Sequence, residues 1–148
     1  MKKILLATCL LIASLICKGQ ISPGLGLGIG YSSQNVPVCQ VQLSVNVSRL
    51  IIVGDIQCPI STKVDQPAIF QSKMGYEITV NKEWGFYPMI GYAYHYGSAD
   101  QEKYNHSAPV FTLQFEKQLE VEFGKLFYSL TYSRKIFMAT IGLKGVIH

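Results

Sequence analysis

The segment CQVQLSVNV, residues 39–47, alternates strictly between apolar and polar side chains. Its apolar members are Cys39, Val41, Leu43, Val45 and Val47. Because successive side chains of a β-strand point to opposite faces, the segment predicts a strand with one apolar and one polar face. The fold then depends on which of these faces meets water.

The same alternation returns along most of the chain beyond residue 22, where no long helical period of apolar residues occurs. In GLGLGIGY, residues 24–31, glycine takes every position of the second face. Pro88 lies inside a strand and predicts a bulge or local irregularity, because proline donates no ladder hydrogen bond. The pattern predicts eight strands near residues 23–33, 38–47, 50–59, 67–80, 84–97, 108–118, 125–133 and 136–147.

The first residues, MKKILLATCLLIASLICKGQ, place two lysines before an apolar run and a small residue, Gly19, at a cleavage position. We interpret residues 1–19 as a secretory signal peptide and residues 20–148 as one domain. With 49% hydrophobic and 15% charged residues, the chain is too apolar to be disordered. Loss of Lys2, Lys3 and Lys18 lowers the formal net charge from +4 to +1, which gives no indication of a nucleic-acid partner.

An even number of antiparallel strands with both ends on one side closes into a barrel without unpaired edges. Small or weakly polar residues dominate the polar face and can pack inside a narrow barrel, whereas soluble barrels place many Lys and Glu on their outer face. Aromatic residues gather at the strand ends, as in interfacial girdles. Near one rim these are Tyr31, Tyr94, Tyr96 and Tyr132, and near the other Trp84 and Phe86. We therefore predict an all-β, eight-stranded antiparallel up-and-down transmembrane β-barrel with its apolar face outward.

Charged residues on the polar face should point into the lumen, where a buried charge is costly unless it is paired. Asp55 and Lys73 are near-opposite partners across the connection at 60–66. The predicted polar network of the lumen comprises Gln40, Gln42, Asp55, Lys73, Glu77, Gln114, Glu116 and Lys144.

Cys39 and Cys58 lie on two strands joined by a tight turn at Ser48 and Arg49. A turn centred there sets the two cysteines opposite each other on one side of the hairpin. We predict a cross-strand disulfide near the outer rim, and the alternative is a pair of unbonded apolar cysteines.

With its signal segment, eight alternating strands and alternating connection lengths, the chain resembles the small bacterial outer-membrane β-barrels of OmpA/OmpX type. The first residues resemble signal sequences of Bacteroidota. The resemblance implies a monomer in the outer membrane, in contact with outer-membrane lipid, with a structural or surface-interaction role in the cell envelope and no catalysis. Its partner would be an extracellular or envelope protein. Eight strands leave no wide channel, so we do not expect a porin.

Two alternatives remain open. If the apolar face pointed inward, the protein would be a secreted, soluble, lipocalin-like barrel around an apolar ligand. The segment HYGSAD, residues 95–100, is similar to the His-x-Ser motif of outer-membrane enzymes that remove acyl chains from lipopolysaccharide, which makes a lipid-modifying hydrolase the second alternative. However, Ser98 follows His95 by three residues rather than two, and His95 should face the lumen rather than a lipid ester.

The longest connection, residues 98–107, is the candidate surface for contact outside the cell, and the alternative is a solvated loop tip. Its candidate contact residues are Asp100, Glu102, Lys103, Tyr104 and His106. His95, His106 and His148 are far apart in sequence, so we predict no metal site and no cofactor.

Overall fold

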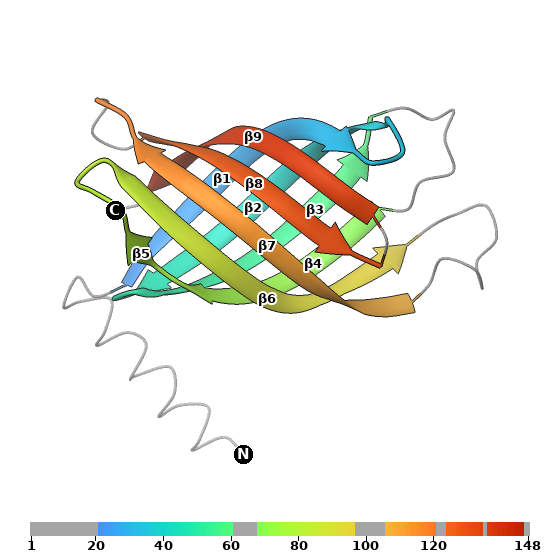
Figure 1. Cartoon of the computed structure of the whole chain (residues 1–148), viewed down its shortest axis with the longest axis horizontal. Helices are drawn as coiled ribbons and strands as arrows, with labels where there is room; N and C mark the ends of the chain where they lie inside the picture. The colour runs from blue at the N-terminus through green and yellow to red at the C-terminus, as the bar shows by residue number, and fades with distance from the viewer. Residues whose placement is uncertain (1–20, 61–67, 97–105, 121–123, 135, 147–148) are drawn as a thin grey trace, which may run out of the picture.

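The alternating segments form β-strands in the computed structural model, which describes residues 21–60, 68–96, 106–120, 124–134 and 136–146 (Figure 1). None of these residues belongs to a helix long and apolar enough to cross a membrane. The strands are β1 (Ile21–Ser32), β2 (Pro37–Val47), β3 (Leu50–Pro59), β4 (Ala68–Tyr76), β5 (Ile78–Thr79), β6 (Trp84–Tyr96), β7 (His106–Gln118), β8 (Gly124–Ser133) and β9 (Ile136–Val146).

The strands pair antiparallel in chain order, and β9 returns to pair with β1 from Gly24↔Val146 to Ser32↔Met138. The short β5 continues β4 in the same register against β6, so the two form one wall strand. The sheet therefore closes as an eight-stranded barrel, whose strands run obliquely around it in Figure 1. The predicted all-β, eight-stranded antiparallel up-and-down barrel is confirmed, with every strand boundary within two residues of its predicted place.

The largest boundary difference at a predicted site concerns His106, which we expected in a loop. It is the first residue of β7 and pairs with His95 of β6.

Pro109 does not stop this strand. Gln118 N donates to Glu83 O, so the even-numbered residues of β7 direct their amides to β6 and the odd-numbered residues direct theirs to β8. The backbone nitrogen of Pro109 therefore points toward β8, and the ladder between β7 and β8 begins only at Val110. Proline therefore removes no ladder hydrogen bond there.

The predicted irregularity at Pro88 is present, but it lies in the neighbouring strand. The ladder between β4 and β6 ends at Gly75↔Met89 and resumes in β5 at Ile78↔Phe86. This register sets Tyr76 opposite Pro88. The backbone nitrogen of residue 88 points toward Tyr76, but proline carries no hydrogen there, so this ladder bond is missing. On its other side, β4 keeps its pairing with β3: the amide of Glu77 donates to Arg49 O at 2.7 Å, one step beyond Leu50↔Tyr76. We call this place, between β4/β5 and β6, the interrupted junction.

The barrel has two ends with different connections. β1 begins and β9 ends at the same end, which also holds the β2–β3, β5–β6 and β7–β8 connections, and we call it the turn end. The other four connections lie at the opposite, or loop, end. At the turn end Ser48 adopts φ 57°, the left-handed conformation that a two-residue hairpin turn requires.

The apolar face of the wall points away from the barrel axis. Leu27, Leu43 and Leu143 are each about 60% exposed, whereas Gln42 and Lys73 on the other face are buried. The inside also holds two apolar clusters: Ile51, Val53, Tyr87 and Met89 near the turn end, and Ile69, Ala93, Val110 and Met138 near the loop end. The alternative of an inward apolar face around an apolar ligand is therefore wrong, because buried polar side chains fill much of the inside.

Candidate functional site

Alternation along the strands brings polar side chains from most of the wall into the lumen. Seven of the eight predicted network residues are buried there: Gln40, Gln42, Asp55, Lys73, Gln114, Glu116 and Lys144. Glu77, the eighth, is half-buried, because it stands in the gap between β4 and β5. It lines a small polar cavity of about 140 Å³ at the turn end, together with Tyr87 and Glu116.

Two ionic clusters occupy different sides of the lumen. On the side of the interrupted junction, Lys73 Nζ of β4 lies 2.5 Å from Asp55 Oδ2 of β3, and both side chains are almost completely buried. This contact joins the two residues that the sequence placed opposite each other. An isolated pair of this kind keeps its charges only because each neutralises the other.

The second cluster joins β7, β8 and β9. Glu116 Oε1 accepts from Lys144 Nζ at 2.7 Å, and Glu116 Oε2 lies 3.2 Å from Lys125 Nζ. Gln114 Nε2 also donates to Glu116 Oε1 at 2.8 Å. The carboxylate therefore has several charged or polar partners, and the Lys125 side chain is 22% exposed, so this cluster reaches water at one corner.

Glutamine side chains of β2, β3 and β4 fill the lumen beside the first ionic cluster. Gln71 Nε2 donates to Gln57 Oε1 at 3.1 Å, and Thr140 Oγ1 donates to Gln40 Oε1 at 2.7 Å. Neither amide atom of Gln42 has a hydrogen-bond partner among the described residues. A buried amide normally finds partners, so this part of the lumen is its least satisfied region.

The lumen also holds polar residues that the predicted network does not include, notably Lys125, Gln57 and Gln71. Their positions follow the same alternation, since Leu126, Ile56 and Phe70 beside them point outward. The signal is therefore present in the sequence, although the predicted network omits these three positions.

His95, the residue of the His-x-Ser resemblance, points into the lumen as expected and is 1% exposed. Its Nε2 lies 3.0 Å from Ser133 Oγ, which also donates to Pro109 O at 3.3 Å. Ser98 lies outside the described residues. The buried His95–Ser133 pair thus sits inside the wall, where a membrane lipid does not reach it.

Cys39 and Cys58 are register partners, as the turn at Ser48 and Arg49 predicted. The predicted disulfide is nevertheless absent: both are free thiols, and Cys39 Sγ donates to Cys58 O at 3.4 Å. Ile60 N donates to Pro37 O, which makes residues 39 and 58 a hydrogen-bonded pair in the ladder. The Cβ atoms of such a pair stand about 5.5 Å apart, farther than the roughly 3.5–4.5 Å that a disulfide spans.

Most of the predicted contact loop, with Asp100, Glu102, Lys103 and Tyr104, lies outside the described residues, as does the predicted signal segment. Within the described ranges, no three His, Cys, Asp or Glu side chains gather to hold a metal ion.

Aromatic residues mark both ends of the outward face. Toward the loop end these include the exposed Tyr31, Tyr94, Tyr96 and Tyr132. Toward the turn end Trp84 stacks on Tyr128 with centroids 6.5 Å apart, and Phe86 packs on Phe115 at 4.7 Å. The two bands bound an apolar zone, which is the arrangement of a transmembrane barrel.

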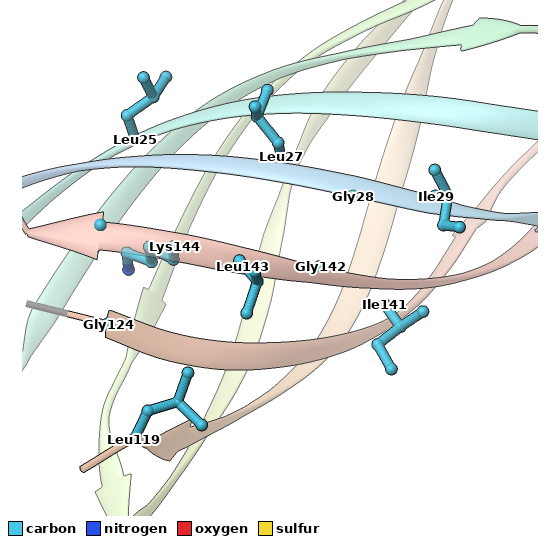
Figure 2. Close-up of a pocket in the computed structure, with 11 residues that line it drawn as sticks. Leu25, Leu27, Gly28, Ile29, Leu119, Gly124, Ile141, Gly142, Leu143 and Lys144 are labelled. Atoms are coloured by element: carbon cyan, nitrogen blue, oxygen red, sulfur yellow. The ribbon is translucent and has the colours of Figure 1, made fainter. Parts of the chain in front are cut away.

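The outward face is hollowed where β1 meets β9, a junction that we call the seam. A groove of about 790 Å³ runs along it, with side chains of β1 on one side and of β9 and the β7–β8 connection on the other (Figure 2). The apolar side chains of this seam groove are Leu25, Leu27, Ile29, Leu119, Ile141 and Leu143.

Glycine makes the close approach at the seam. A Cβ on Gly142 would collide with the carbonyl oxygen of Leu27. From inside, the ring of the buried Phe127 covers the same glycines and would lie 3.0 Å from a Cβ on Gly28. The aromatic ring thus replaces side chains that the narrow seam cannot hold.

A second outward groove, of about 430 Å³, lies at the interrupted junction. Exposed apolar side chains of four strands form its walls, and Pro88 lies between them. The wall residues of this junction groove are Leu50, Met74, Tyr76, Ile90, Phe111 and Leu113.

Comparison with known proteins places this geometry among membrane barrels. No protein-family model matches the chain, and no curated protein matches its sequence. Among solved structures, a de novo designed transmembrane β-barrel is similar with a TM-score of 0.65 at 12% identity, over 85% of this chain and 95% of the design. The N-terminal β-barrel domain of Pseudomonas aeruginosa OprF gives a TM-score of 0.65 at 10% identity, over 85% of this chain and 97% of that one.

The Yersinia pestis outer-membrane protein Ail gives a TM-score of 0.55 at 12% identity, over 85% of this chain and 99% of Ail. Identities this low show the fold alone. The chain thus has the fold of the small outer-membrane β-barrels, and the resemblance seen in the sequence is confirmed at that level.

Proposed function

We propose that the protein is a non-enzymatic barrel of the bacterial outer membrane with a structural or surface-interaction role in the cell envelope. The observation that carries the proposal is the distribution of side chains across the barrel wall. Large apolar side chains such as Leu27, Leu43 and Ile90 are exposed on the outside, whereas charged and amide side chains are buried inside. Such a wall is stable in lipid and prone to aggregation in water. The filled lumen supports a role without a wide channel.

A surface-interaction role draws on Ail, the attachment invasion locus protein, of which one similar structure holds the heparin analogue sucrose octasulfate. On this proposal the connections at the loop end make the contact with an extracellular or envelope protein.

The first test is membrane fractionation of the full chain, followed by gel migration with and without boiling in detergent. We expect recovery in the outer membrane and a band that shifts on boiling. A matched pair of variants makes the test sharper. Leu43→Arg, in the middle of the apolar wall, should cost about 2–4 kcal/mol in a bilayer, whereas Glu83→Arg at the exposed turn end should cost little. Recovery of the chain as a soluble protein that tolerates both changes would contradict the proposal.

The absence of catalysis has its own test. Lipopolysaccharide incubated with the folded chain should release no acyl chain. Release that is lost in His95→Gln, while the boiling-sensitive band persists, would favour the lipid-modifying hydrolase instead.

A further inference from the structure

The junction groove differs from the seam groove in what stands beside it. Arg49, in the exposed β2–β3 turn, directs Nη1 to the hydroxyl of Tyr76 at 3.5 Å, and Tyr76 itself lines the groove. Arg49 has no carboxylate within ion-pair distance among the described residues. The turn-end mouth of this apolar groove therefore carries an available guanidinium and a phenol.

The β3–β4 ladder brings Arg49 to the groove. The amide of Glu77 bonds to Arg49 O at 2.7 Å, which continues that ladder beyond Leu50↔Tyr76 and ties the turn to the end of β4. This bond holds Arg49 beside Tyr76 and therefore beside the groove that begins at Pro88.

The seam groove offers no such cation in the described part of the chain. Lys144 lines it, but its Nζ is buried in the lumen and bonded to Glu116 at 2.7 Å. The seam groove thus presents hydrocarbon alone, although it is the larger of the two.

We propose that Arg49, Tyr76 and the junction groove form a binding site for one anionic phospholipid, with an acyl chain in the groove and the phosphate at Arg49. The charge of the guanidinium complements the phosphate, and its planar fork suits two phosphate oxygens. The apolar walls match the acyl chain. This inference rests on the proposed function, because the groove meets lipid only if the barrel spans a membrane.

The test measures how many lipids the detergent-purified full chain retains in native mass spectrometry, after reconstitution in vesicles of phosphatidylcholine with phosphatidylglycerol. We expect the wild-type chain to retain phosphatidylglycerol in preference to phosphatidylcholine. Arg49→Gln should lower this preference about fivefold, while Arg49→Lys should keep part of it. Ile90→Trp, which fills the groove, should reduce retention of both lipids.

Two matched variants serve as controls. Lys117→Gln removes another cation of the turn end, one that lies over Trp84 at 5.7 Å, and Leu27→Trp fills the seam groove. Both should leave the preference unchanged. An equal loss in Lys117→Gln and Arg49→Gln would overturn the site in favour of general attraction at the rim, and equal retention of the two lipids by the wild-type chain would overturn it outright.

Failure of the proposed function looks different. A wild-type chain that does not enter the vesicles would refute both proposals, whereas a chain that enters them, shows the boiling-sensitive band and keeps its lipid preference in Arg49→Gln would refute the lipid site alone.

Discussion

The seam and the interrupted junction lie on opposite sides of the barrel, and each carries a groove on the outward face. The seam has an unbroken ladder, and its groove lies where Gly145 of β9, paired with Leu25, has no side chain on the outward face. The junction has bulky side chains and is hollow because Pro88 lacks an amide. A barrel wall can therefore be opened by removing either a side chain or a hydrogen bond. Among the described residues, only the junction groove has an available cation beside it, Arg49 of the β2–β3 turn.

The largest effect should come from the ion pair on the junction side. Asp55→Asn leaves Lys73 buried with no carboxylate partner among the described residues and should cost about 3–5 kcal/mol. On the seam side, Lys125→Met should cost about 1 kcal/mol or less, because Glu116 keeps Lys144 and Lys125 is partly exposed. Urea unfolding followed by the fluorescence of Trp84, the single tryptophan, measures both. Equal losses in the two variants would show that the two sides do not differ in this way.

The next effect concerns the glycine contact at the seam. Gly142→Val should cost about 2–3 kcal/mol, because its side chain would strike the Leu27 carbonyl and the Phe127 ring. Gly54→Val is the control, since a Cβ there would meet only Gln71 O, at 4.0 Å, and should change stability little. The fraction of boiling-sensitive band at increasing urea reports both variants. If Gly142→Val were as stable as Gly54→Val, close packing would not explain the seam.

Pro88→Ala tests the junction directly, because it returns an amide to the position opposite Tyr76. The change in stability should stay within about 1 kcal/mol, the net contribution of one hydrogen bond. The new amide of residue 88 should be protected from hydrogen exchange, whereas the amide of Glu77, which bonds to Arg49 O in the β3–β4 ladder, should keep its protection. Fast exchange at residue 88 would mean that proline does not cause the interruption.

The smallest effect is expected at the cysteine pair, which lies at neither junction. Cys39→Val should alter stability by less than about 0.5 kcal/mol, since both thiols are free and the valine keeps an apolar side chain in the wall. Alkylation of the chain, denatured without reductant, should modify both Cys39 and Cys58. A chain that takes up no reagent until it is reduced would restore the disulfide that the sequence predicted.

Alternation predicted the strand count and, with one tight turn, the register of Cys39 with Cys58. The outward direction of the apolar face needed two further signals, the small polar residues of the other face and the aromatic residues at the strand ends. The disulfide prediction was wrong, because alternation shows that two cysteines are opposite each other but not whether they form a hydrogen-bonded or a non-hydrogen-bonded pair of the ladder. The distance between their Cβ atoms depends on that difference. The half-buried position of Glu77 depends on Pro88 of the next wall strand, and both grooves depend on contacts between strands. No local pattern contains that information.

The seam also has a consequence for how fast the barrel forms. Every other junction of the wall joins strands that follow one another in the chain and can form as a hairpin, whereas the seam brings together segments such as Ser33 and Phe137, 104 positions apart. Such distant pairing carries the largest loop-closure entropy and is slow. Until it occurs, β1 and β9 are open edges able to pair with other chains. The rate of closure, and the yield against aggregation, should therefore depend on β1 and β9 more than on the hairpins between them.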